Sequence, residues 1–174
     1  MIGESPQVKG LWLCEAVWVK DAPGVAKLLV DMMTDGITET DIHSVDVARY
    51  YPMQKTPEYI RGRCYESAFK IYNPAVHSRE PYTEGRNLRR SPFWQREQEL
   101  GGYFMELAGW ERAHGYAANE VLLEKYGDRV PVRENEWDNR HFWRVSNAEH
   151  LAMSDNAGMI NLSHFAVFDI SGAD

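Results

Sequence analysis

The chain has few of the features that mark disulfide-rich, zinc-binding and membrane-spanning proteins. Cys14 and Cys64 are its two cysteines in 174 residues. They are too few for a disulfide framework or a thiolate zinc site, and a reducing compartment fits best. No apolar run approaches the roughly 20 residues of a membrane helix, and the first ten residues lack the basic and apolar regions of a signal peptide. These absences predict a soluble, intracellular protein with no membrane partner.

Positive charge is also scarce. The chain carries 19 lysine and arginine residues against 26 aspartate and glutamate residues, a net charge of −7. Such a surface repels phosphate backbones, so nucleic acid is not expected as a partner. Six histidines lack the short spacing of metal-ligand pairs, so no metal site is predicted. They are His43, His77, His114, His141, His150 and His164.

What the chain does contain is a globular composition, with 44% hydrophobic and 12% aromatic residues. One hydrophobic core is therefore expected. Residues 1–10 are polar and turn-rich, residues 11–19 predict a mostly buried strand that contains Cys14, and residues 24–33 predict an amphipathic helix that ends before Gly36. A tight turn through Pro23 joins the strand to the helix.

The middle of the chain begins with a helix marked by Thr56 as N-cap and Pro57 at its first position. This helix is expected to run to Tyr72 and to bury an apolar face. The face consists of Ile60, Cys64, Ala68 and Ile71. A long loop covers residues 73–90, and Ser91 followed by proline predicts a shorter helix that ends at Leu100.

The remaining elements alternate between strand and helix. A strand is expected at residues 103–107, helices at 120–126 and 137–153, and strands at 159–162 and 165–170. The fold class is therefore α+β. Residues 171–174 are typical of a strand exit that places Asp174 at a helix N-cap. Either the chain is a piece of a longer protein or it is a natural domain with frayed termini.

A cluster of arginines and several tryptophans could in principle form a ligand-binding site. Four arginines lie close together, and they are expected to pair with carboxylates such as Glu97 or Glu99 instead of binding phosphate. They are Arg86, Arg89, Arg90 and Arg96. The large aromatics are expected to pack in the core or between domains. They are Trp94, Trp110, Trp137 and Trp143.

Three stretches together resemble the sarcosine dehydrogenase and dimethylglycine dehydrogenase/oxidase family. The first runs from GLW at residues 10–12 to APGVAK at 22–27, and it resembles the last strand and helix of a flavin-binding domain. The second runs from RNLRRSPF at 86–93 to AGWER at 108–112, and it resembles the family's central domain. The third, from NLSHF at 161–165 to FDISGAD at 168–174, resembles the opening strands of an aminomethyltransferase-like folate-binding module.

The resemblance implies a domain plan. Residues 1–36 correspond to the end of the FAD-dependent oxidoreductase domain, 37–150 to the central linker domain and 151–174 to the start of the folate-binding domain. The full-length parent is expected to use FAD and tetrahydrofolate to demethylate N-methylated glycines oxidatively. The chain lacks the G-x-G-x-x-G motif that binds a dinucleotide, so it is expected to hold no cofactor by itself. No catalytic residue can be assigned.

One cofactor contact does follow from the resemblance. The turn formed by Ala22, Pro23, Gly24 and Val25 opens a helix where the family places the flavin edge that becomes negative on reduction. A helix N-terminus suits such charge. The alternative is that these four residues form only a strand-to-helix turn.

The expected partners are the remaining flavin and folate domains of the parent and, through exposed apolar surface, other copies of the chain. The compartment is the cytoplasm in a bacterium or the mitochondrial matrix in a eukaryote. The alternative function is a free-standing, non-catalytic interaction or scaffold domain that uses the same linker fold.

Overall fold

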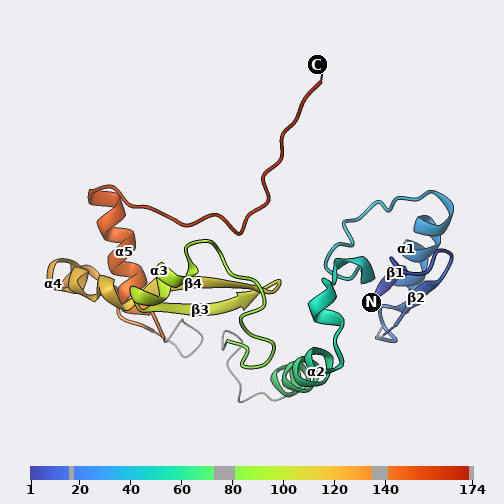
Figure 1. The fold of residues 1–174 in the computed structure, drawn as a ribbon, viewed down its shortest axis with the longest axis horizontal. Coiled ribbons are helices and arrows are strands. Elements are labelled where there is room, and N and C mark those ends of the chain that lie inside the picture. The colour runs from blue at the N-terminus through green and yellow to red at the C-terminus, as the bar shows by residue number, and fades with distance from the viewer. Residues whose placement is uncertain (16–17, 73–80, 135–140, 173–174) are drawn as a thin grey trace. The chain divides into compact units, whose positions relative to one another are not determined.

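The structure is a computed structural model that describes residues 1–15, 18–72, 81–134 and 141–172. The chain forms two compact units, Met1–Thr56 and Pro57–Asp174. Both helices and strands are present (Figure 1), which confirms the α+β class. The division of these elements among a flavin domain, a linker domain and a folate module, with boundaries after residues 36 and 150, stays a prediction.

The first unit is built on a short hairpin. Strand β1 (Ile2–Glu4) pairs antiparallel with β2 (Trp12–Cys14), and helix α1 (Ala22–Thr34) follows. Ile2 is 1% exposed, and its N–H donates to the carbonyl of Val45 at 3.0 Å. The first ten residues were expected to be only polar and turn-rich, and this was wrong because Ile2 supplies the buried apolar anchor of a strand. Two short 3-10 helices, Val47–Arg49 and Pro52–Lys55, complete the unit.

The strand expected at residues 11–19 is shorter and more exposed than predicted. It spans three residues, Cys14 is exposed, and the side chain of Trp18 is 57% exposed. Residues 16–17 lie outside the described residues. A two-stranded hairpin offers no second sheet layer to cover its outer face, and α1 contains no fully buried residue. Large apolar side chains of this unit, such as those of Trp18 and Val30, therefore face solvent.

Helix α2 (Pro57–Tyr72) begins at the predicted proline but buries a different face. Ile60 and Cys64 are exposed, whereas Arg63 and Lys70 are partly buried and Glu66 is 9% exposed. The apolar face was wrong because residues 81–86 and the neighbouring hairpin present carbonyls and carboxylates to the helix. The side chain of Ile71 and residues 73–80 of the predicted loop fall outside the described part of the structure.

A second hairpin organises the rest of the second unit. Strand β3 (Gly102–Leu107) confirms the predicted strand, and it pairs antiparallel with β4 (Trp110–Tyr116), which the sequence did not predict. Ala108 and Gly109 form the turn with positive φ values of 52° and 83°. Helix α3 (Trp94–Glu99) precedes the hairpin and confirms the predicted helix after Ser91.

Three helical segments lead from the hairpin to α5. They are the 3-10 helix Ala117–Val121, helix α4 (Leu122–Tyr126) and the 3-10 helix Gly127–Arg129. Helix α5 (Trp143–Asp155) then packs against α4, with Tyr126 2% exposed and Ala148 fully buried. Both helices confirm predictions, although Trp137 lies outside the described residues. In the part of the chain that the structure describes, no helix is long and apolar enough to cross a bilayer.

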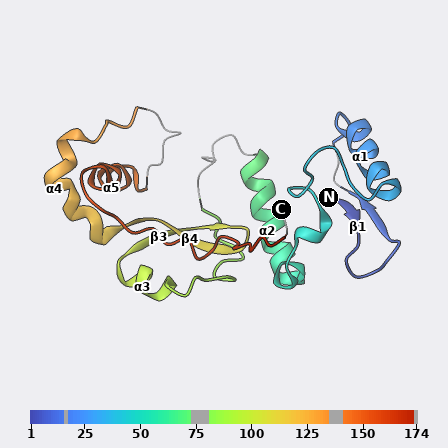
Figure 2. The same cartoon turned by 90° about the horizontal axis from the view of Figure 1, so that it is seen from above.

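Residues 156–172 form an extended tail that leaves α5 and passes the β3–β4 hairpin (Figure 2). The two strands predicted at 159–162 and 165–170 are not formed. A strand needs a hydrogen-bonding neighbour, and the described residues offer this segment a turn instead, in which Phe165 N–H donates to the carbonyl of Leu162. Val167 and Ile170 are 91% and 97% exposed. The predicted N-cap at Asp174 lies outside the described residues.

Candidate functional site

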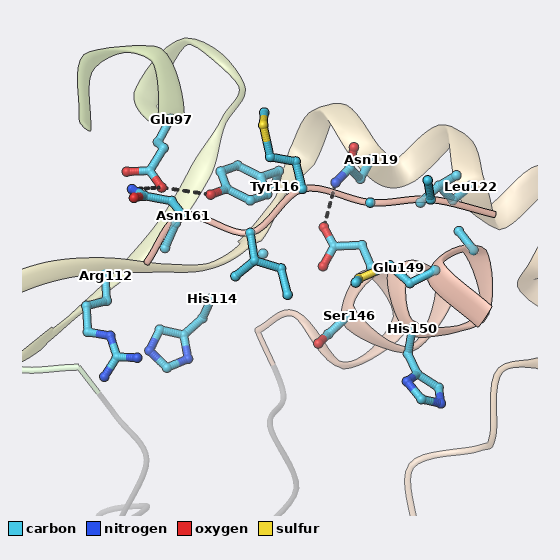
Figure 3. A pocket seen from close by; sticks show the side chains of 18 of the residues that line it. Glu97, Arg112, His114, Tyr116, Asn119, Leu122, Ser146, Glu149, His150 and Asn161 are labelled. Carbon is cyan, nitrogen blue, oxygen red and sulfur yellow. Dashed lines mark hydrogen bonds between the residues drawn. The ribbon is translucent and has the colours of Figure 1, made fainter. Parts of the chain in front are cut away.

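A pocket of about 610 Å³ opens in the second unit between β4, α5 and the tail (Figure 3). Strand β4 contributes Arg112, His114 and Tyr116 to the pocket lining, and a shift in its register with β3 between Gly102 and Phe104 interrupts the regular alternation of its side chains. Helix α5 contributes Ser146, Glu149 and His150 from the other side of the pocket. Residues 157–161 and His164 of the tail form a further wall. The volume is in the range of small-molecule sites.

A hydrogen-bonded cluster around Glu97 fixes the tail at the edge of this pocket. The carboxylate of Glu97 is 6% exposed and accepts hydrogen bonds from Tyr116 Oη at 2.9 Å and from Asn161 Nδ2 at 3.0 Å. The same amide nitrogen donates to Ser91 Oγ at 3.0 Å. Burial and the neighbouring carboxylate of Glu97 raise the pKa of Tyr116 well above its usual range. The phenol therefore stays protonated and serves as a structural donor.

The most deeply buried carboxylate near the pocket, Glu111, is engaged by Arg86. Arg86 Nε donates to Glu111 Oε1 at 2.9 Å, and its Nη2 donates to Oε2 at 2.6 Å, so the pair is bidentate. The N–H of Asn87 donates to Oε1 at 2.6 Å. Burial disfavours the charged form, but the hydrogen bonds from Arg86 and Asn87 outweigh burial and hold the pKa of Glu111 below its usual value.

This pairing confirms the structural role predicted for Arg86 and corrects its partner, which is Glu111 instead of Glu97 or Glu99. Arg89 and Arg90 have other roles, since their guanidinium groups lie over aromatic rings. Arg89 is 4.1 Å from the ring centroid of Trp110, and Arg90 is 3.9 Å from that of Trp94. The four arginines therefore do not converge on one anion site.

The lowered pKa of Glu111 predicts an acid limit to stability. A carboxyl whose folded pKa lies below its unfolded value stabilises the fold above the unfolded pKa, and this contribution is lost as pH falls through the folded pKa. The Glu111 contribution to the free energy of urea unfolding, taken as the difference between the parent and Glu111→Gln, should therefore be nearly constant from about pH 7 to pH 5 and should fall below the ordinary value of 4.5. The variant Glu111→Gln should show a flatter acid limb. An unchanged limb in this variant would contradict the assignment.

The predicted flavin-edge residues form the first turn of α1. The helix begins at Ala22, Pro23 occupies its first turn, and the N–H of Val25 donates to the carbonyl of Asp21 at 3.0 Å. A Cβ added at Gly24 would meet no atom within 4 Å, so the backbone there is open to close approach. This geometry suits one edge of a flavin ring. The described residues offer no glycine-rich cradle for the FAD pyrophosphate.

Charge at this helix start is balanced locally. Lys20 Nζ lies 2.8 Å from Asp21 Oδ1, and both side chains are exposed. The positive charge of Lys20 offsets the negative charge of Asp21, which would otherwise repel the negatively charged edge of a reduced flavin. No described contact tests whether the four residues touch flavin, so that assignment stays a prediction.

Sequence reasoning missed the pocket because it missed β4. Arg112 and His114 were visible as a charged residue and a scattered histidine, but without β4 their common face could not be seen. The alternation of Arg112 and His114 was the available pattern. The described residues contain no cluster of three or more His, Cys, Asp or Glu side chains suited to a metal ion. His77 lies outside them.

Comparison with known proteins gives a consistent family signal. Residues 35–91 match the family described as "FAD dependent oxidoreductase central domain". The chain is 32% identical, over 99% of its length, to "4-methylaminobutanoate oxidase (formaldehyde-forming)" of Paenarthrobacter nicotinovorans. These matches support the FAD-dependent oxidoreductase family. The chain spans 20% of that oxidase.

Two further relatives carry names that indicate different roles. The chain is 25% identical over 98% of its length to the mitochondrial "Pyruvate dehydrogenase phosphatase regulatory subunit" of Mus musculus, of which it spans 19%. It is 30% identical over half of its length to an "Aminomethyltransferase" of Neisseria meningitidis, of which it covers 16%. The chain therefore corresponds to a minor part of each of these longer proteins.

Proposed function

We propose that the chain is the middle segment of a flavin-dependent enzyme that oxidatively demethylates N-methylated glycines, sarcosine or dimethylglycine. The observation that carries this proposal is the 32% identity to an N-methyl amino acid oxidase across 99% of the chain. Bound FAD would supply the two-electron acceptor for oxidation of the N-methyl group, and hydrolysis of the oxidised substrate would release formaldehyde. The match to an aminomethyltransferase supports tetrahydrofolate as an alternative acceptor of the one-carbon unit.

In this proposal the chain binds and orients without supplying the reacting groups. Ala22, Pro23, Gly24 and Val25 place the positive end of α1 against the flavin edge that gains negative charge on reduction. The exposed tail at residues 159–170 continues into a folate-binding sheet. The partners of the chain are thus the flavin and folate domains of the same parent.

The purified chain should carry no flavin and should not oxidise sarcosine or dimethylglycine. The physical reason is that one helix end cannot hold a dinucleotide, whose pyrophosphate needs a close backbone approach at a glycine-rich turn. Visible absorbance after gel filtration in excess FAD, together with dye reduction on addition of substrate, measures both properties. Flavin that stays with the chain, or dye reduction that depends on substrate, would contradict the segment assignment.

A second candidate function is supported by the similarity to a phosphatase regulatory subunit over 98% of the chain. In that case the fold serves as a non-catalytic interaction domain in a protein that does not turn over N-methylated amines. The two candidates differ in one property of the longer protein. The oxidoreductase reduces its flavin with an N-methylated glycine, whereas the regulatory protein does not.

A further inference from the structure

Three nitrogen-bearing side chains gather at one end of the pocket beneath the tail. Arg112 and His114 lie side by side on β4, at the end opposite Ser146 and His150 of α5 (Figure 3). His164 joins them from the tail, beside Phe165, whose ring lies 5.5 Å from the Arg112 guanidinium. Partial burial and the charge of Arg112 lower the pKa of both histidines, so both lie within electrostatic reach of that guanidinium.

The carboxylates that line the same pocket are already occupied. Glu111 is held by Arg86, Glu97 accepts from Tyr116 and Asn161, and Glu149 accepts from Asn119 at 2.7 Å. These contacts account for every glutamate among the described lining residues.

At the basic end of the pocket, no described carboxylate is paired directly with Arg112 or His164. Across the described ranges Arg112 has no carboxylate partner, and Nε2 of His164 is buried without a hydrogen-bond partner. A buried polar nitrogen without a partner costs free energy and calls for a specific explanation. An anionic ligand would satisfy both groups at once.

The rest of the pocket is mixed, with polar side chains such as Ser146 and Glu149 beside apolar ones. Leu122 of α4, Met153 of α5 and Ile160 of the tail line it, beyond the basic end. A ligand that reaches from the basic end to these three side chains carries a hydrocarbon body as well as an anionic head. Glu97, which lies close enough to His164 to raise its pKa, disfavours a dianion such as phosphate.

We propose that this pocket binds a small organic monocarboxylate, with the carboxylate between the Arg112 guanidinium and His164 Nε2 and the hydrocarbon body against Leu122, Met153 and Ile160. Arg112 offers the planar pair of donors that matches a carboxylate. The site lies in the second unit and is independent of the flavin edge proposed for α1. The outcome of its test therefore does not depend on the proposed oxidoreductase function.

Titration of the intact chain with sodium butyrate tests the site. The histidine ring resonances in a carbon-proton NMR spectrum should show a saturable shift for His164 and His114. Butyramide, which has the same shape without the charge, should bind at least about tenfold more weakly because it forms no charge-assisted hydrogen bonds. Inorganic phosphate should compete weakly. Equal binding of butyramide, preferential binding of phosphate, or no saturable shift would overturn the proposal.

Two variants locate the binding to these side chains. Arg112→Gln should weaken butyrate roughly 10- to 100-fold, the loss expected for hydrogen bonds to a charged group. Arg96→Gln is the matched control, because Arg96 pairs with Glu99 on the surface and does not line the pocket, and it should bind butyrate as the parent does. If Arg112→Gln does not fold, His164→Ala in the tail replaces it and should weaken binding in the same direction. Undiminished binding in the folded variant would refute the site.

Discussion

Replacing Arg86 by alanine is expected to lower the free energy of unfolding of the second unit by about 3–5 kcal/mol. The Glu111 side chain is 1% exposed and Arg86 is 23% exposed, so the variant leaves a carboxylate buried without its cation. Arg86 also donates to the carbonyls of Tyr82 and Phe104, at 2.8 Å and 3.0 Å. One side chain thus joins the loop before α3 to both strands of the hairpin.

Thermal unfolding followed by circular dichroism measures this loss, which should appear as a fall in Tm of about 10 °C or more. Arg96→Ala is the matched control, because its pair with Glu99 has side chains 67% and 52% exposed. Exposed pairs contribute about 0–1 kcal/mol. Similar small losses in both variants would show that the Arg86 pair does not hold the hairpin and loop together.

Replacing Arg63 by alanine is expected to release α2 from the hairpin. Arg63 Nη1 lies 2.5 Å from Glu106 Oε2, and the two side chains are 13% and 5% exposed. Nη2 donates to the carbonyl of Glu84 at 2.8 Å, and the guanidinium lies 4.1 Å from the ring centroid of Tyr82. Removing these contacts leaves the Glu106 carboxylate buried without its cation, although the N–H of Gly109 still donates to it, at a cost of about 3–5 kcal/mol.

Amide hydrogen exchange distinguishes release of α2 from global unfolding. In Arg63→Ala, protection should fall across Pro57–Tyr72 while β3 and β4 keep their pairing, because the hairpin ladder does not depend on Arg63. Arg61→Ala is the matched control on the same helix, since Arg61 is exposed, and it should exchange like the parent. Equal protection of α2 in both variants would contradict the anchoring role.

Local chemistry predicted several elements because their determinants lie within a few residues. Pro57 marks the start of α2, and the spacing of apolar residues indicated α1 and α5. The buried face of α2 could not be predicted this way. Apolar periodicity favoured Ile60 and Cys64, but the residues packed against the helix are polar, so charged side chains are buried there. Such a choice depends on partners distant in sequence.

The conformation of the tail and the position of the pocket could not be predicted from the sequence, for related reasons. Residues 159–170 have the composition of strands, but hydrogen bonding to a neighbouring strand decides whether a strand forms. The pocket needs β4 to align Arg112 and His114, α5 to close the opposite side, and Asn161 to fix the tail. Glu97 alone joins Ser91, Tyr116 and Asn161, contacts that span 64 residues of sequence. No local pattern contains that information.

Anaerobic reduction of flavin in the longer protein that contains these residues tests the central claim most directly. The account predicts that this protein purifies with flavin and that sarcosine or dimethylglycine bleaches its visible absorbance. Formaldehyde should appear without tetrahydrofolate and should decrease when tetrahydrofolate is supplied. A folded protein that holds no flavin, or whose flavin stays oxidised with both substrates, would contradict the account and favour the regulatory alternative.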